Sequence, residues 1–254
     1  MDDTSRRRAF LVATGAALVT ACQKNGQVPV AAAATGSTPP DENRSSTNQQ
    51  NQGKDAEDVS ATEDLMREHG AIRRVLIVYR EAAARLRAKA GSVPPDPLQQ
   101  AAQLMRSFAE EYHEKKLEET HIFPALAKAG GPLAATVSTL IAQHRRGREI
   151  TESILAMTQK TVSPQAAEPL ARSLEAFARM YELHAAIEDT VIFPAWKKAL
   201  TPKELDAMGD RFEDIEHETF GKDGFEAAVA QVGSIEKALG IDLDAWTAPP
   251  PPRA

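Results

Sequence analysis

The sequence predicts an all-α protein built around an up-down-up-down four-helix bundle. Only 5% of the 254 residues are aromatic, 42% are hydrophobic with Ala and Leu dominant, and alternating β-branched runs are scarce, which disfavours a sheet protein. In four segments between residues 61 and 200, apolar residues recur at steps of three and four, as they do on one face of a helix. Helices of this length with short connections pack antiparallel, and each buries one apolar stripe.

The charge and the cysteine content exclude several classes of function. The net charge of −6 argues against a basic nucleic-acid-binding protein. Cys22 is the sole cysteine, so the chain can form neither an internal disulfide nor a thiolate metal site. The sequence also contains no nucleophile constellation and no phosphate-cradling glycine loop. Any transition metal must therefore be held by histidine and carboxylate ligands.

Residues 1–21 have the features of a signal peptide. Arginines precede an apolar run, residues 9–21, that is too short to cross a bilayer permanently. Arg7 and Arg8, followed by Ala-Phe-Leu, resemble the twin-arginine export motif, and the segment ending at Cys22 resembles a bacterial lipobox with a lipidated cysteine. The alternative is a basic N-terminus followed by an ordinary apolar helix. The signal predicts a lipoprotein that is exported folded and anchored to a membrane through Cys22, facing the periplasm or the cell exterior.

Residues 22–60 predict a disordered linker behind the lipid-anchor cysteine. From Gln23 to about Ser60 the chain consists mainly of Ala, Thr, Gly, Ser, Pro, Asn and Gln, with almost no large apolar side chain. Such a segment cannot offset the entropy that it would lose on ordering. We expect it to act as a flexible tether that holds the folded part off a membrane surface.

The first two helices of the bundle, which spans residues 61–200, each carry a histidine on their apolar stripe. The first begins with Thr62 as its cap and ends before Gly91, and its stripe is Leu65, His69, Ile72, Leu76, Tyr79 and Ala83. The second runs from about Leu98 to Lys128, and its stripe includes Met105, Ala109, His113 and Leu117. The stretch Gly130-Gly131-Pro132 then breaks the chain.

The next two helices repeat this pattern. The third has the stripe Val137, Ile141, His144, Arg148, Thr151 and Leu155. The fourth opens at Ser163-Pro164 and has the stripe Leu174, Phe177, Tyr181, His184, Glu188 and Val191. Thr201 and Glu204 form a capping box that opens a C-terminal helical extension, residues 201–240, which we expect to continue irregularly through Gly221 and Gly224. Residues 241–254 form a proline-rich tail.

An internal repeat relates the two halves of the predicted bundle. Glu118-Glu-Thr-His-Ile-Phe-Pro124 matches Glu188-Asp-Thr-Val-Ile-Phe-Pro194, 70 positions later (118 + 70 = 188). Each copy follows a helix with one inward histidine. The bundle is therefore expected to be two helical hairpins related by an approximate two-fold axis.

The distribution of the histidines points to a metal site. Four histidines fall one per helix on or beside the buried stripe, with two acids about one turn further on: His69, His113, His144, His184, Glu118 and Glu188. Unpaired buried polar groups cost roughly 1–3 kcal/mol each and an unpaired carboxylate several, so six would cost on the order of 10 kcal/mol. A dry network in which these groups hydrogen-bond one another is the alternative. A metal would satisfy all six at once.

The ligand types restrict the metal. Imidazole and carboxylate without sulfur suit iron, manganese or zinc, and two carboxylates able to bridge suggest two ions in one cavity. A ferritin-like di-iron site needs Glu-x-x-His from each of two helices. Here that spacing occurs twice on the second helix, at Glu110 with His113 and at Glu118 with His121, and on no other helix. A ferritin-like arrangement is therefore disfavoured.

The chain resembles the hemerythrin-like (HHE cation-binding) family over about residues 62–200. The resemblance is carried by four stretches, which are Arg67-Glu-His69-Gly, Tyr112-His113-Glu-Lys-Lys-Leu-Glu118-Glu-Thr-His-Ile-Phe-Pro124, Gln143-His144-Arg-Arg-Gly and His184-Ala-Ala-Ile-Glu188-Asp-Thr-Val-Ile-Phe-Pro194. It implies a carboxylate-bridged, non-haem di-iron centre in a four-helix bundle that binds dioxygen reversibly. It also implies that the four histidines are terminal ligands and that Glu118 and Glu188 bridge the ions.

Two features depart from the family pattern. Oxygen-carrying hemerythrins have a second histidine one turn after the third-helix histidine, and Arg148 stands there in this chain. In addition, five residues separate His113 from Glu118, which places them about 140° apart on a regular α-helix. Glu114 or Glu119 therefore remains a possible substitute for Glu118.

Other polar residues near the stripes have two interpretations each. The tyrosines Tyr79, Tyr112 and Tyr181 either pack in the core or act beside the ligands, through a hydrogen bond to a group around the site or in redox chemistry. Arg148 is expected to neutralise an acidic cavity, while Arg145 and Arg146 face solvent. His121 is expected at the periphery of the site, and His217 on the surface of the C-terminal extension.

Three functions are compatible with this sequence. The first is a non-enzymatic protein with two iron ions that binds or senses dioxygen, or a related small diatomic, outside the cytoplasm. The second is a di-iron enzyme with oxidase, peroxide or nitric oxide chemistry, which the replacement of a ligand histidine by Arg148 favours. The third is a protein that holds labile iron or zinc at the cell envelope.

Overall fold

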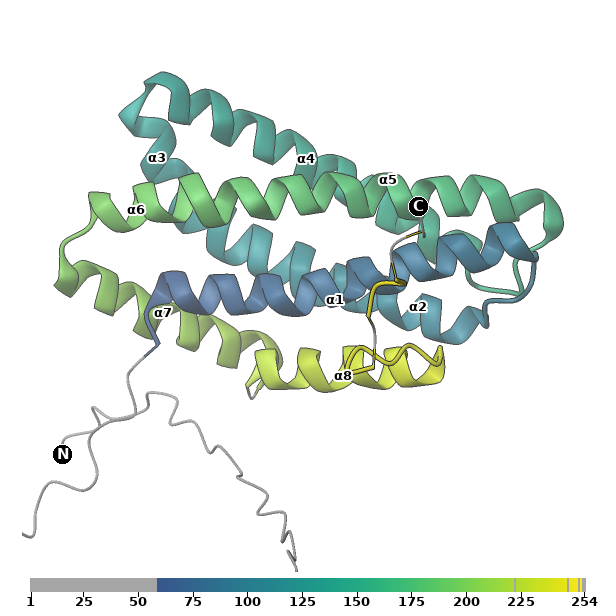
Figure 1. Cartoon of the computed structure of the whole chain (residues 1–254). Coiled ribbons are helices and arrows are strands. Elements are labelled where there is room, and N and C mark those ends of the chain that lie inside the picture. Colours follow the sequence, from purple (N-terminus) through teal and green to yellow (C-terminus); the bar gives the residue numbers. More distant parts are fainter. Residues whose placement is uncertain (1–58, 222, 246, 251, 253–254) are drawn as a thin grey trace, which may run out of the picture. The chain divides into compact units, whose positions relative to one another are not determined.

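The computed structural model describes residues 59–254 except 222, 246, 251, 253 and 254. Every regular element among these residues is a helix (Figure 1). The predicted signal peptide, the lipid-anchor Cys22 and nearly all of the predicted linker lie outside the described residues. None of the described helices is both long and apolar enough to cross a membrane.

The four-helix bundle is confirmed, with the helices where the apolar periodicity predicts them. The first long helix is α1 (Ala61–Ala88), and the third is α4 (Gly131–Met157). The second consists of α2 (Pro95–Leu104), η1 (Met105–Ile122) and α3 (Phe123–Ala129). The fourth consists of α5 (Pro164–Ile187), η2 (Glu188–Ile192) and α6 (Phe193–Ala199). In Figure 1, α1 and α5 lie side by side along most of their lengths. The apolar stripes form one core, in which Leu76, Leu98 and Leu174 are at most 1% exposed.

The start of α1 differs from the prediction by two residues. Ser60, rather than Thr62, is the N-cap, because Ser60 and Glu63 form a reciprocal capping box. The Ser60 hydroxyl accepts the Glu63 N–H at 3.4 Å, and the Glu63 carboxylate accepts the Ser60 N–H at the same distance. Thr62 is thereby left inside the first turn, where it is buried.

The second and fourth long helices are not regular α-helices, contrary to expectation. Both contain π-helix, whose hydrogen bonds join residues five apart: the long segment η1 and the single turn η2. The Phe123 N–H donates to the Glu118 carbonyl, and the Phe193 N–H donates to the Glu188 carbonyl. A proline follows each phenylalanine, and its ring would clash with the carbonyl four residues earlier in a regular helix. The wider turn before each proline removes that clash.

The π turn also explains why one residue that was predicted to be in the core is exposed. Val191 was expected on the buried stripe of the fourth helix, but its side chain is 42% exposed, and the adjacent Ile192 is fully buried instead. The wider turn at η2 shifts the helix face by about one residue. The π turn thus redirects side chains beside the predicted site.

The C-terminal extension consists of two regular helices, which corrects the expected irregular continuation. They are α7 (Pro202–Phe220), opened by the predicted capping box of Thr201 and Glu204, and α8 (Gly224–Ala238). Gly221 ends α7 in the left-handed region, with φ of 68°, where a residue without Cβ is favoured. Both helices pack along α1 on one side of the bundle (Figure 1). Arg74 on α1 holds α8 through two hydrogen bonds to Glu236, at 2.9 and 2.5 Å.

Candidate metal centre

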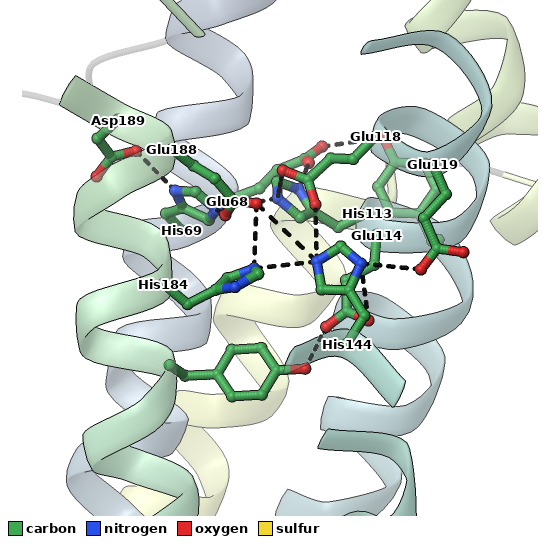
Figure 2. A network of polar contacts seen from close by, with 12 residues as sticks. Glu68, His69, His113, Glu114, Glu118, Glu119, His144, His184, Glu188 and Asp189 are labelled. Carbon is green, nitrogen blue, oxygen red and sulfur yellow. Dashed lines mark hydrogen bonds and ion pairs between the residues drawn. The ribbon is translucent and has the colours of Figure 1, made fainter. Parts of the chain in front are cut away.

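The structure brings all six predicted ligand side chains together inside the bundle (Figure 2). Each long helix contributes one histidine, and the second and fourth also contribute a glutamate. None of these residues is more than 2% exposed: His69, His113, Glu118, His144, His184 and Glu188. The bundle core therefore surrounds a chamber lined by imidazoles and carboxylates.

The four imidazoles form two pairs. The Nε2 atoms of His69 and His113 are 3.0 Å apart, and those of His144 and His184 are also 3.0 Å apart. Two imidazole nitrogens bound at right angles to one ion, each at roughly 2.1 Å, would be about 3.0 Å apart. The spacing of each pair therefore fits two ligands of one ion.

Glu118 and Glu188 each reach both histidine pairs. The Oε1 and Oε2 atoms of Glu118 lie 3.4 Å from the Nε2 atoms of His113 and His144. Glu188 Oε2 lies 3.4 Å from His69 Nε2, and Glu188 Oε1 lies 3.1 Å from His184 Nε2. None of these four carboxylate oxygens accepts a hydrogen bond from the described residues. Each carboxylate thus has oxygens near both histidine pairs, and it would contact both ions if each pair held one.

The outer nitrogen of each imidazole has its own oxygen partner. The Nδ1–H of His69 donates to Asp189 at 2.7 Å, and that of His113 donates to Glu68 at 2.6 Å. The Nδ1–H of His144 donates to Glu119 at 2.8 Å, and that of His184 donates to Gln143 at 2.9 Å. A carboxylate oxygen only accepts hydrogen bonds, so the proton of a neutral ring sits on Nδ1 and leaves a lone pair on Nε2. Such partners fix the ring orientation of metal-bound histidines in proteins.

The chamber consequently contains only hydrogen-bond acceptors when its histidines are neutral. Four Nε2 lone pairs and four carboxylate oxygens face one another, so a positive charge among them is required for stability. Protonation of His69 and His113 is one source of that charge in the metal-free protein, whereas burial lowers the pKa of His144. Although burial opposes protonation of the His69 and His113 rings, contacts with Asp189 and Glu188 raise the pKa of His69, and contacts with Glu118 and Glu68 raise that of His113. Divalent cations would take the place of these protons, and the donor set fits iron, manganese or zinc.

The geometry favours Glu118 over its two neighbours as the shared ligand. Glu119 accepts the His144 Nδ1–H and lies 2.5 Å from Arg148 Nη2. Although burial opposes ionisation, these contacts lower the pKa of Glu119 to about 2. Glu114 accepts hydrogen bonds from Tyr181 and Arg148. The π-helix explains why Glu118 fits, because residues five apart lie about one turn apart there.

Arg148 has the neutralising role that the sequence predicted for it. Its Nη2 lies 3.1 Å from Glu114 and 2.5 Å from Glu119. Arg145 and Arg146 are exposed, also as predicted. Because a guanidinium stays protonated, Arg148 is not a metal ligand, although it stands where the resemblance implied a further histidine.

Sequence reasoning missed three of the four outer partners and saw Glu119 only as a substitute ligand. The missed residues are Glu68, Gln143 and Asp189, and each is adjacent in sequence to a predicted ligand. That adjacency is the signal that could have revealed them. The tyrosines divide between the two predicted roles: Tyr112 donates to Glu68 at 2.9 Å, Tyr181 donates to Glu114, and Tyr79 packs edge-on against Phe177.

Two further histidines lie outside the chamber, as predicted. His121 is partly buried with its ring near Phe212, at 5.7 Å between ring centroids. His217 is exposed on α7 and donates from Nδ1 to the Glu213 carbonyl.

Comparison with known proteins agrees with this site. The family model of the hemerythrin HHE cation-binding domain matches residues 60–196. The chain is 45% identical over 192 residues to uncharacterized proteins of Mycobacterium tuberculosis and Mycobacterium bovis, and the match covers 74% of each chain. No solved structure matches the chain. The chain therefore belongs to the hemerythrin HHE cation-binding domain family, and its buried histidine and glutamate clusters are consistent with a di-iron site.

Proposed function

We propose that this protein holds two iron ions in the chamber and binds or senses dioxygen, or a related small diatomic, outside the cytoplasm. The observation that carries the proposal is the composition of the chamber, in which four Nε2 atoms face one another in two pairs and four carboxylate oxygens have no hydrogen-bond partner among the described residues. Zinc or manganese would suit the same donors. We favour iron because its redox chemistry allows it to bind a small diatomic.

Each ion would have one histidine pair and share both carboxylates. His69 and His113 would hold one ion, His144 and His184 the other, and Glu118 and Glu188 would bridge them. The hydrogen bonds on Nδ1 fix the rings before the metal arrives, which limits the entropy lost on binding. The surrounding apolar core excludes bulk water from the chamber.

Arg148 determines where an exogenous ligand would bind. Its contacts with Glu114 and Glu119 keep the guanidinium beside the His144–His184 pair without coordination. This pair therefore lacks the additional histidine of the oxygen carriers. An exogenous ligand would therefore approach the His144–His184 pair, next to Arg148.

The test is metal content combined with absorption spectroscopy. Purified protein should bind about two iron ions per chain, and exposing the ferrous form to air should produce near-ultraviolet and visible charge-transfer bands. The double variant His69→Ala, His184→Ala should lose both the iron and the bands. A featureless spectrum from iron-loaded protein would exclude diatomic binding, and rapid loss of metal to a micromolar chelator would instead favour metal handling at the envelope.

A di-iron enzyme is the second candidate. The observation in its favour is a set of polar side chains beside the His144–His184 pair, in which Tyr181 and Arg148 both donate hydrogen bonds to Glu114. Hydrogen-bond donors at this position could assist reduction of peroxide or nitric oxide. Multiple turnovers with either substrate would establish an enzyme, whereas stoichiometric binding alone would establish a carrier or sensor.

The proposed location depends on the N-terminal motifs. Arg7 and Arg8 would direct export through the twin-arginine route, and Cys22 would receive the lipid anchor. Changing Cys22→Ser should release the mature protein from the membrane fraction, and Arg7→Lys with Arg8→Lys should retain the precursor in the cytoplasm. Membrane association that survives Cys22→Ser would contradict lipid anchoring.

A further inference from the structure

The exposed apolar residues of the described chain lie on a single helix. Three large hydrophobic side chains are exposed among the described residues, and all three belong to the fourth long helix: Leu183 at 61%, Ile187 at 36% and Val191 at 42%. They follow one another at steps of four along α5 and η2, so they form one line on its outer side, which we call the outer stripe. The wider turn at η2, which turns Val191 outward, adds its third residue. A contiguous exposed apolar surface of this kind marks a docking site.

The acidic residues of the same helix are neutralised along its seam with α1. Apart from Glu188 in the chamber, the helix has four acids at intervals of seven residues, and each contacts an arginine of α1. The pairs are Glu168 and Glu175 with Arg87, Glu182 with Arg80, and Asp189 with Arg73. Seven residues are close to two helical turns, so these acids lie on one flank of the helix. They leave the outer side of the helix without an unpaired negative charge.

The cations of the same helix stay exposed at both ends of the outer stripe. Arg172 and Arg179 precede the stripe, Lys197 and Lys198 follow it, and all four are exposed. No described acid forms an ion pair with Arg179, Lys197 or Lys198. The outer side of the helix is therefore apolar in the middle and positively charged at each end.

Cationic and apolar groups also meet in a surface hollow beside the stripe. The hollow has a volume of about 590 Å³ and is lined by Arg80, Glu175, Arg179, Glu182 and Leu183. Both of its acids are paired with arginines of α1. The hollow thus offers the guanidinium of Arg179 beside the apolar side chain of Leu183. A phospholipid presents the complementary groups, a phosphate next to acyl chains.

This distribution of charge fits an anionic lipid surface better than a second copy of the chain. At a bilayer, apolar side chains enter the boundary between headgroups and acyl chains, while lysines and arginines contact the lipid phosphates. Two copies that paired through the outer stripe would meet differently. Because both ends of the stripe are cationic, parallel and antiparallel pairing would each bring like charges together, which disfavours the contact.

The described chain begins at the end of the bundle where the two lysines lie. α1 starts beside α6 and α7 (Figure 1), and residues 23–58 separate this point from Cys22. A flexible linker of that length spans roughly 30–36 Å, whereas the 28 residues of α1 extend about 42 Å. A chain attached to a membrane at Cys22 is therefore long enough for the side of the bundle to reach the same membrane.

We propose that the outer side of α5, η2 and α6 docks onto an anionic lipid bilayer. The outer stripe enters the boundary between headgroups and acyl chains, and the flanking cations contact lipid phosphates. This contact is peripheral, since none of the described helices can span a membrane. It goes beyond the proposed function, because it requires neither the metal nor a lipid on Cys22. Docking would fix the orientation of the bundle on the membrane, which an anchor at the end of a linker leaves free.

The first test locates the contact with a fluorescent probe. Cys22→Ser leaves the full chain without cysteine, so a single new cysteine can carry a polarity-sensitive fluorophore. Ile187→Cys places the probe in the outer stripe, and Ser234→Cys places it on the exposed surface of α8 as the control. With vesicles of phosphatidylglycerol and phosphatidylcholine in equal parts, emission at position 187 should shift to shorter wavelengths, while emission at position 234 should not change. A shift at both positions, or at neither, would overturn the proposal.

The second test removes the positive charge at one end of the stripe. In the full chain with Cys22→Ser, Lys197→Glu with Lys198→Glu should weaken cosedimentation with these vesicles by at least roughly tenfold. Lys89→Glu with Lys237→Glu is the matched control, because it changes the net charge equally at exposed lysines outside the fourth helix. Residues 1–21 are common to all these proteins, so they do not affect the comparison. An equal loss in both double variants would show that net charge, rather than this face, determines binding.

The remaining outcome is self-association. If the protein forms a dimer without vesicles, and Leu183→Glu abolishes that dimer in analytical ultracentrifugation, the outer stripe is a subunit interface and the proposal is wrong. The docking and the proposed function can also fail separately. Vesicle binding is measured without reference to iron, and the iron content and absorption bands are measured without lipid.

Discussion

The two halves of the chamber repeat one arrangement around the histidine of their first helix. In each, Nδ1 donates to a carboxylate that an arginine also contacts, and a phenylalanine ring stacks on the imidazole at 5.4 Å between centroids. The equivalent groups are His69, Asp189, Arg73 and Phe193 in one half and His144, Glu119, Arg148 and Phe123 in the other. The internal repeat therefore extends from the sequence to the contacts of the site.

The halves differ around the histidine of their second helix. His113 donates to the Glu68 carboxylate, whereas His184 donates to the Gln143 amide. A carboxylate partner makes an imidazole a stronger metal ligand than an amide does. If iron binds as proposed, the duplicated scaffold would thus offer a stronger metal position at the His69–His113 pair and a weaker one at the His144–His184 pair. The weaker position is also the one beside Arg148.

The largest effect should come from a residue that both halves share. Glu188→Gln removes the carboxylate that lies 3.4 Å from His69 Nε2 and 3.1 Å from His184 Nε2. We expect the iron content to fall from about two to below one per chain, because both positions lose a charged ligand. Elemental analysis after gel filtration measures this, with Glu216→Gln as the buried control. Retention of two irons would refute a shared bridging role.

Removing one histidine from each half should separate the two positions. His184→Ala should leave about one iron per chain, held by the carboxylate-supported His69–His113 pair. His113→Ala should retain less, because it removes a ligand from the stronger position. Iron content after dialysis against a chelator is the measurement, and the exposed His217→Ala is the control. Equal retention in the two variants would show that the positions are equivalent.

Exchanging the outer partners should reverse the difference between the halves. Glu68→Gln should weaken the stronger position by about 10- to 100-fold, while Gln143→Glu should strengthen the weaker one. Stepwise titration with zinc against a competing chelator would resolve the two affinities. If neither change alters the separation between the two binding steps, the outer partners do not determine it.

The fold and the inward positions of the candidate ligands could be predicted from the sequence because both follow from periodicity. The stripes that bury Leu76 and Leu174 also place His69 and His184 on the inner face, and no tertiary information is needed to see this. The π-helix could not be predicted in this way. Residues such as Tyr112 and Leu117 favour neither kind of turn by composition. The π turn that places Glu118 about one turn after His113, and the exposure of Val191, were therefore not foreseen.

The outer partners could not be predicted because they lie across helix interfaces. Asp189 meets His69 from the fourth helix, and Glu68 meets His113 from the first. Which neighbour of a ligand turns towards another helix depends on the relative rotation of the two helices. That rotation follows from packing of the whole bundle rather than from any local pattern.

The smallest expected effect concerns two glycines beside candidate ligands. Gly70 directly follows His69 on the first long helix, and Gly147 lies three residues after His144 on the third. A Cβ at Gly147 on α4 would overlap the Tyr181 hydroxyl, whereas a Cβ at Gly70 on α1 would meet nothing within 4 Å. Gly147→Ala should therefore destabilise the protein by about 1–3 kcal/mol, because Tyr181 must move away from Glu114. Gly70→Ala should stabilise it by about 0.5–1 kcal/mol, since alanine is the better helix former. Urea unfolding of the metal-free protein measures both, and a Gly147→Ala variant as stable as Gly70→Ala would mean that Tyr181 is not held as tightly as its contacts indicate.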